Sequence, residues 1–206
     1  MARYTRHDAT KTPAGNLYLM SHLLRSFCAV VLATSLTAAS NDHFPDDRDC
    51  VAVFDLFVAI AAPACAPAAQ RYEQPDKIAA AIHLLVSQGF VQAKDFDNIR
   101  ASFCPLSNGL GLTPSPDSVY LDDGLQQASV DTLAEVLFHE LYHVRQMREL
   151  GAQSFKCAYI DSLIACNGCT DQRHALEAPA HEAQGLVRDA LLNRWLKHNA
   201  AGQGPP

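Results

Sequence analysis

The chain has 206 residues, of which 49% are hydrophobic and 18% are charged, a composition that suits one folded domain with a sizeable core and excludes a disordered chain. Its formal net charge is −6. Without residues 1–39, which carry four basic residues and one acidic residue, 12 basic and 21 acidic residues remain and the net charge is −9. Because such a surface repels a phosphate backbone, we expect no nucleic-acid partner.

The segment that begins at Met20 has the layout of a secretory signal peptide. Arg25 precedes an apolar run over residues 27–36, and small residues follow. The run is about half of the roughly 20 residues that a membrane-spanning helix needs. We therefore predict a signal peptide in residues 1–40, with residues 1–19 an upstream extension if Met20 is the start. The expected product is periplasmic or secreted, without a stable membrane span; a buried first helix of the mature fold is the alternative.

The cysteine count supports export. Seven cysteines become six when Cys28 leaves with the signal peptide, and an even set in an exported chain favours three disulfides. The six are Cys50, Cys65, Cys104, Cys157, Cys166 and Cys169. Their connectivity stays open, but proximity in the sequence makes Cys50 to Cys65, and bonding within the last three, the first pairs to test. The CNGC sequence at 166–169 is alternatively half of a structural zinc site or a redox pair, although no second CxxC accompanies it.

The first half of the mature chain contains two helical segments and then two short strands. A first helix over residues 49–62 ends before Pro63, and a second extends from Pro75 to about Gly89 with apolar residues at helical spacing. Short alternating runs at 96–103 and 118–123 indicate strands, and the sequence PLSNGLGLTPSP between them indicates turns.

The second half is helical throughout. Ser129 and Asp131 offer N-caps for a long helix over residues 132–149 that ends at Gly151. Its expected apolar stripe contains Leu133, Leu137, Leu141 and Val144. A further helix covers residues 153–166. The last helix, over residues 175–199, is expected to have Leu186, Ala190, Leu191 and Trp195 on one side. This order of elements predicts an α+β fold, mostly α, in one domain over residues 41–206.

The long helix carries the motif HExxH within LFHELYHVRQMRELG. Positions i and i+4 lie on one face of a helix, so His139 and His143 can reach one ion, and neutral imidazoles are good Zn²⁺ ligands. Glu140 can lie beside the open coordination position, accept a proton from zinc-bound water and pass it to a leaving amine. Apolar neighbours surround these three residues, and burying them without a partner would cost several kcal/mol, which a metal ion offsets.

A catalytic zinc needs three protein ligands and an open fourth position. The third ligand must come from farther along the chain, where Glu177, His181 and Glu182 lie on the last predicted helix. Glu177 and His181 share one helical face, whereas Glu182 lies about 140° around from Glu177. The two carboxylates are therefore not expected to bind the same ion.

Residues 97–186 resemble a known family. The sequences HELYHVRQ, FKCAYIDSLIAC and HALEAPAHEA are similar to the small HExxH domains of the extracellular contractile injection system core type, within the glutamate-zincin group of zinc metallopeptidases. The resemblance implies a zincin-like domain with a short β element before the HExxH helix. It also implies that Zn²⁺ is the cofactor.

Carried over position by position, the resemblance implies that His139 and His143 are metal ligands and Glu140 is the catalytic base. Glu177 matches the glutamate of the family's Glu-x-x-Ala element, which makes it the preferred third metal ligand. The chain departs from the family in three positions: His174 replaces the usual asparagine, Pro179 lies inside the element, and His181 stands where an aromatic residue is common. Glu182 or His181 remain alternative ligands.

In this group of peptidases an extended strand ahead of the motif helix binds the substrate backbone by edge pairing. Residues 117–123 match that element, and an ordinary edge strand is the alternative. Tyr142, Tyr159 and His181 are candidates for a second donor to the oxyanion, although Tyr142 is more consistent with packing.

The sequence thus predicts an exported zinc-dependent peptidase that acts on a peptide or protein substrate. We expect Gln146 and Arg145 to lie beside the site or on the surface and to perform no chemistry. One alternative is a non-catalytic zinc-binding or disulfide-stapled interaction module. Another is a secreted, disulfide-rich effector whose activity lies in the N-terminal helices and whose motif is vestigial.

Overall fold

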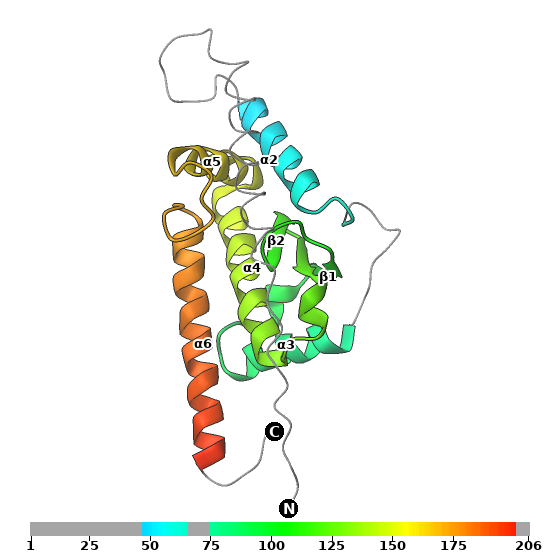
Figure 1. Cartoon of the computed structure of the whole chain (residues 1–206), viewed down its shortest axis with the longest axis vertical. Helices are drawn as coiled ribbons and strands as arrows, with labels where there is room; N and C mark the ends of the chain where they lie inside the picture. The colour runs from blue at the N-terminus through cyan, green and yellow to red at the C-terminus, as the bar shows by residue number, and fades with distance from the viewer. Residues whose placement is uncertain (1–46, 66–74, 201–206) are drawn as a thin grey trace, which may run out of the picture. The chain divides into compact units, whose positions relative to one another are not determined.

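A computed structural model describes residues 47–65 and 75–200, which belong to one compact unit spanning His43–Pro206. The signal peptide predicted in residues 1–40 lies outside the described residues. The described part is mostly helical α+β, as the sequence predicts (Figure 1). Its helices are α2 (Asp47–Ala61), α3 (Pro75–Ser87), α4 (Val130–Leu150), α5 (Ala152–Ala165) and α6 (Glu177–Ala200), with short 3₁₀ turns η1 (Ala93–Phe96) and η2 (Asp123–Gln126).

The sheet has three strands: β1 (Arg100–Cys104), β2 (Gly111–Ser115) and β3 (Ser118–Asp122), in the order β1-β3-β2. β3 pairs in parallel with β1 and antiparallel with β2. β2 is not predicted by the sequence, because its glycine and proline indicate turns. Pro114 is tolerated there because β2 lies at the edge of the sheet, where a missing N–H removes no ladder hydrogen bond.

The strand assigned to substrate pairing is also corrected. Residues 117–123 contain β3, which is the central strand and has a hydrogen-bonded neighbour on each side. β2 is an edge strand, and it packs directly against α4. Backbone groups for edge pairing beside the motif helix therefore come from β2.

The motif helix α4 begins and ends as its sequence predicts. The Ser129 side chain accepts a hydrogen bond from the Thr132 N–H, and Gly151 follows the last turn with φ of 84°, a conformation that favours glycine. All four residues of the predicted apolar stripe are buried, at exposures of 0–8%. They join a core shared with α3, the sheet and α6. The helix that carries the histidines is thus fixed on several sides.

Helix α6 lies alongside α4 (Figure 1). It buries Ala180, Val187 and Leu191, which recur at intervals of seven and four residues and so form one stripe. The predicted stripe was wrong at Leu186 and Trp195, which are 66% and 50% exposed. Ala180, Val187 and Leu191 occupy the contact with α4, so the start of α6 comes close to the HExxH motif.

The three disulfides connect Cys50 with Cys157, Cys65 with Cys104, and Cys166 with Cys169. The last bond confirms pairing within the C-terminal group, whereas the expected Cys50 to Cys65 bond is wrong. The reason is geometric: eleven residues of helix separate Cys50 from the end of α2, about 16 Å at 1.5 Å per residue. Instead Cys50 joins α2 to α5, where Phe54, Phe155 and Ile160 form a second core. Three disulfides are typical of an oxidising, extracytoplasmic environment.

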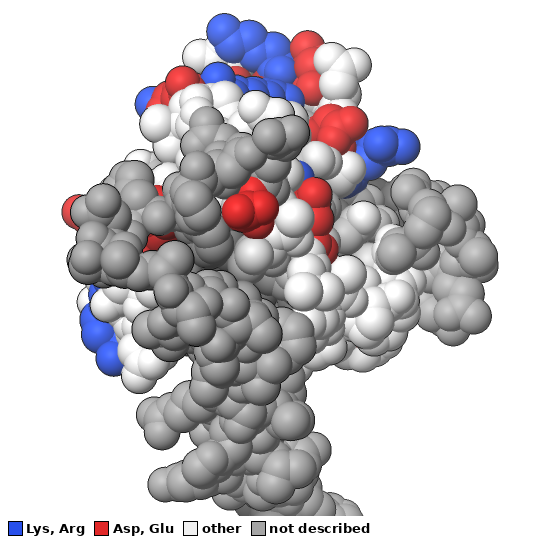
Figure 2. All heavy atoms as spheres, turned by 90° about the horizontal axis from the view of Figure 1, so that it is seen from above, with Lys and Arg blue, Asp and Glu red and all other residues white. Residues whose placement is uncertain are grey.

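The apolar character of the helices and the distribution of surface charge both bear on partners. Among the described residues, no helix combines the length and apolar character needed to cross a membrane. On the face shown in Figure 2, the visible acidic and basic side chains are interspersed and do not separate into broad patches of one sign.

Candidate metal centre

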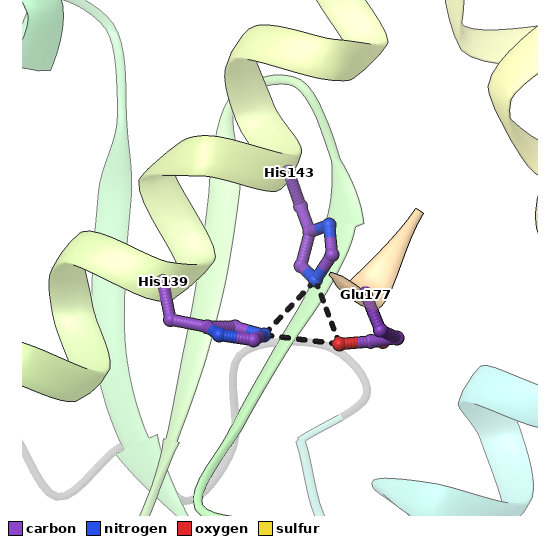
Figure 3. A group of neighbouring side chains, drawn as sticks. All are labelled: His139, His143 and Glu177. Atoms are coloured by element: carbon purple, nitrogen blue, oxygen red, sulfur yellow. Dashed lines mark hydrogen bonds and ion pairs between the residues drawn. The ribbon is translucent and has the colours of Figure 1, made fainter. Parts of the chain in front are cut away.

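Helix α4 points both histidines of the motif at the start of α6. His139 and His143 are one turn apart and buried, at exposures of 8% and 5%, with ring centroids 4.9 Å apart. Glu177, the first residue of α6, is buried at 6% and faces both rings (Figure 3). Three potential ligands therefore meet in one place. Two come from α4 and one from α6, and His143 and Glu177 are 34 positions apart in the sequence.

The three ligand atoms form an almost equilateral triangle. The Nε2 atoms of His139 and His143 are 3.1 Å apart, and they lie 3.1 Å and 3.3 Å respectively from Glu177 Oε2. Ligands held at about 2.0–2.1 Å around a tetrahedral Zn²⁺ ion are about 3.3–3.4 Å from one another. The triangle thus has nearly the dimensions of one face of that tetrahedron.

Gln146 determines which ring nitrogen of neutral His143 carries the proton. The Gln146 Nε2 atom donates to the Leu176 main-chain oxygen at 3.0 Å, so its Oε1 atom faces His143 Nδ1 at 2.8 Å. Because Oε1 only accepts, Nδ1 carries the proton, and in neutral His143 the Nε2 lone pair is directed at the triangle. Gln146 thus lies beside the site, as the sequence predicts, whereas Arg145 is exposed and pairs with Glu149.

A network of hydrogen bonds holds Glu177 on the side away from the two histidines. The Tyr159 hydroxyl donates to Glu177 Oε1 at 2.8 Å, which leaves Oε2 for the histidines. His174, fully buried, bonds through Nε2 to the Tyr159 main-chain oxygen, and its Nδ1 accepts from the N–H groups of Leu176 and Glu177. His174 therefore caps the start of α6. The Tyr159 hydroxyl donates to Glu177 and is not free to stabilise an oxyanion.

The pKa shifts reflect the same contacts. Burial alone would raise the pKa of Glu177, but the hydrogen bonds from His139, His143 and Tyr159 outweigh it and hold that pKa far below its ordinary range. Burial opposes charge on His143, yet hydrogen bonding to Glu177 and the nearby carboxylates raise its pKa. The pocket thus favours an anion at Glu177 and positive charge beside it.

The remaining residue of the motif, Glu140, faces the edge strand. It is 4% exposed, and its Oε2 atom accepts a hydrogen bond from the Thr113 hydroxyl at 2.9 Å. Burial raises the pKa of Glu140, against the attraction of His143 and His139. A carboxyl group whose proton affinity is raised in this way is suited to accept a proton and return it.

The structure brings together His139, His143 and Glu177, and the other two candidates lie outside this triangle. Glu182 is exposed, on a different side of α6 from Glu177. His181 is half-buried at the rim, with its ring 4.7 Å from that of His139 and its Nε2 atom 3.9 Å from Glu177 Oε2. Thr113 was missed because it lies in a segment assigned to turns.

The donor set fits a divalent cation. Two imidazole nitrogens and a carboxylate oxygen, all buried, lie within 4.8 Å of one another. Only one proton can lie between the Nε2 atoms of His139 and His143. The remaining lone pair and the negative charge of Glu177 therefore meet at this point with too few hydrogen-bond donors. The Nδ1 atom of His139 is also buried, and among the described residues no hydrogen-bond partner reaches it. A cation held by the Nε2 atoms and Glu177 Oε2 would balance the lone pairs and charge of the triangle, although it would not supply a partner for His139 Nδ1; two imidazoles with one carboxylate suit Zn²⁺.

Comparison of the chain with protein-family models, curated proteins and solved structures found no match. The assignment of the site therefore rests on its own geometry.

Proposed function

We propose that the protein is an exported zinc-dependent peptidase. His139, His143 and Glu177 would hold the ion, and the observation that carries the proposal is the triangle of 3.1, 3.1 and 3.3 Å between their ligand atoms. This set is the one expected when an HExxH helix is completed by a glutamate from a later helix. When bound, Zn²⁺ supplies a Lewis acid that polarises a water molecule and the scissile carbonyl.

Glu140 would act as the proton carrier. It lies next to a ligand in the sequence, is buried, and interacts electrostatically with both motif histidines. As a carboxylate it takes a proton from the attacking water, and as a carboxylic acid it gives that proton to the departing amine. Its raised pKa supports both halves of this role.

The substrate would be an extended peptide that pairs with the edge strand β2. One side of β2 is bonded to β3, and the strand packs on the motif helix beside Glu140. An added strand gains main-chain hydrogen bonds whatever its side chains are. His181 is half-buried at the rim of the cluster, and its Nε2–H would have to exchange its hydrogen bond with the Thr170 main-chain oxygen to donate to the carbonyl oxygen of such a peptide.

One observation favours a second candidate, a non-catalytic zinc-binding module. His139, Glu140, His143 and Glu177 all have exposures of 4–8%, so substrate has little direct access to them in this conformation. A structural zinc site has its fourth position filled by the protein, whereas a catalytic site leaves it to water or substrate.

The variant Glu140→Gln separates the two candidates. The peptidase proposal expects this variant to keep zinc at the wild-type stoichiometry and to lose about 100-fold or more of its rate on fluorescein-labelled casein. Exposed Glu182→Gln is the matched control and should cleave as the wild type does. Full activity in Glu140→Gln contradicts the mechanism, and zinc binding without cleavage in the wild type favours the structural module.

A further inference from the structure

Strand β2 forms a fitted wall against Glu140. Gly111 and Thr113, two residues apart on this strand, both meet Glu140 of α4. A Cβ atom at position 111 would come within 2.6 Å of Cδ and Cγ of Glu140. The Glu140 side chain therefore lies in the space that any larger residue at 111 would need.

Thr113 supplies the polar part of this wall. Its hydroxyl lies 2.9 Å from Glu140 Oε2 and 3.0 Å from the Glu140 main-chain oxygen, and Thr113 is 4% exposed. Its single hydroxyl proton is shared between these two oxygens of Glu140, and no hydrogen bond of the hydroxyl goes to a metal-ligand candidate. Within the described residues, Thr113 is the one side chain that hydrogen-bonds the Glu140 carboxylate.

The three metal-ligand candidates and the proposed base, Glu140, are held in place by different parts of the fold. The metal triangle is held by Gln146, Tyr159 and His174, which come from the helices and the loop before α6. The base is held from the sheet. Loss of the Thr113 hydroxyl would therefore free the Glu140 carboxylate to turn about its own χ angles while the three ligand atoms stay in place.

We propose that Thr113 is the positioning residue of Glu140: its buried hydroxyl fixes the direction of the carboxylate, and Gly111 leaves room for it. This inference rests on the proposed peptidase function for its kinetic consequence. The hydrogen bond between Thr113 and Glu140 does not depend on that function and can be measured without a substrate.

The test compares Thr113→Val, which keeps the shape and removes the hydroxyl, with Thr113→Ser, which keeps the hydroxyl. Ser118→Ala is the matched control, because Ser118 lies on the neighbouring strand β3 and its hydroxyl bonds to Asp117. The measurements are zinc per chain, and kcat and KM on fluorescein-labelled casein. Thr113→Val should keep zinc and KM while kcat falls about 10- to 100-fold, and Thr113→Ser should restore kcat to within about threefold of the wild type.

A second measurement uses proton NMR of the wild-type protein, zinc-loaded and zinc-free. The Thr113 hydroxyl proton should exchange slowly with water and show a nuclear Overhauser effect to the Glu140 side chain, which also decides the matter if Thr113→Val fails to fold. A freely exchanging hydroxyl overturns the proposal, as does wild-type kcat in Thr113→Val, equal impairment in Thr113→Ser, or loss of zinc in Thr113→Val. If the wild type does not cleave casein, the peptidase function fails while the spectrum still decides whether Thr113 holds Glu140.

Discussion

His174 and Tyr159 are held together twice: the His174 Nε2–H donates to the Tyr159 main-chain oxygen at 3.0 Å, and the two rings lie against each other with centroids 4.3 Å apart. Burial lowers the pKa of His174, so the ring is neutral and its Nδ1 atom can accept from main-chain N–H groups at the start of α6. Because Tyr159 in turn donates to Glu177, the two residues fix both the backbone and the carboxylate of this candidate ligand.

Replacing His174 with alanine should destabilise the protein and loosen Glu177. The change leaves two N–H groups at the start of α6 and the Tyr159 carbonyl without partners, and we expect a loss of about 1–3 kcal/mol in the free energy of unfolding. His174→Asn should recover part of this, because an asparagine oxygen can accept the same cap hydrogen bonds. Urea unfolding of the zinc-free proteins measures both. Equal stability of His174→Ala and the wild type would contradict the capping role.

Tyr159→Phe removes a single hydroxyl from behind Glu177. Burial, followed by the negative charge of Glu177, raises the pKa of Tyr159 well above its ordinary value, so the hydroxyl stays protonated and donates. We expect zinc affinity to fall about 10- to 100-fold, the range typical when a group that orients a metal ligand is removed. Competition with a chromogenic chelator measures the affinity. Tyr142→Phe, on the motif helix, is the control, and the account is wrong if both variants bind zinc equally well.

The stability of the zinc-free protein should depend on pH through Glu177 and His143. The pKa of Glu177 is lowered, so its contribution is present above its unfolded value, about 4.3, and is lost as pH falls through the folded value. The pKa of His143 is raised, so its contribution is complete below about 6.5 and is lost as pH rises through the folded value. Their pair therefore contributes most between about pH 4.5 and 6.5.

Zinc should reverse the upper part of this dependence. A metal ligand must be a neutral imidazole, so protons and zinc compete for His143. The increase in melting temperature caused by added zinc should grow as pH rises from about 5.5 to about 8. Thermal unfolding with and without zinc over this range is the measurement. An increase that is largest at pH 5.5 would show that the ion binds elsewhere.

The helices and the motif could be predicted from the sequence because their signals are local. The spacing of His139 and His143, the cap at Ser129 and the buried stripe of α4 all lie within one helix. The pairing of Cys50 with Cys157 could not be predicted, since it depends on how α2 packs on α5. The contact of Thr113 with Glu140 depends likewise on an edge strand whose sequence, with Gly111 and Pro114, is typical of turns.

The choice of Glu177 as third ligand was only partly available from the sequence. Helical geometry separated Glu177 from Glu182, but the preference came from a resemblance to a family. The structure adds a physical reason, because the packing of α6 on α4 brings Glu177 to the histidines and leaves Glu182 exposed.

The central claim is that His139, His143 and Glu177 form a zinc site, and the most direct test is the zinc content of the mature protein purified with its disulfides intact. We predict one zinc ion per chain in the wild type and in Glu182→Ala, and loss of the ion in Glu177→Ala. Stoichiometric zinc in Glu177→Ala, or its absence from the wild type in a zinc-containing buffer, would contradict the account.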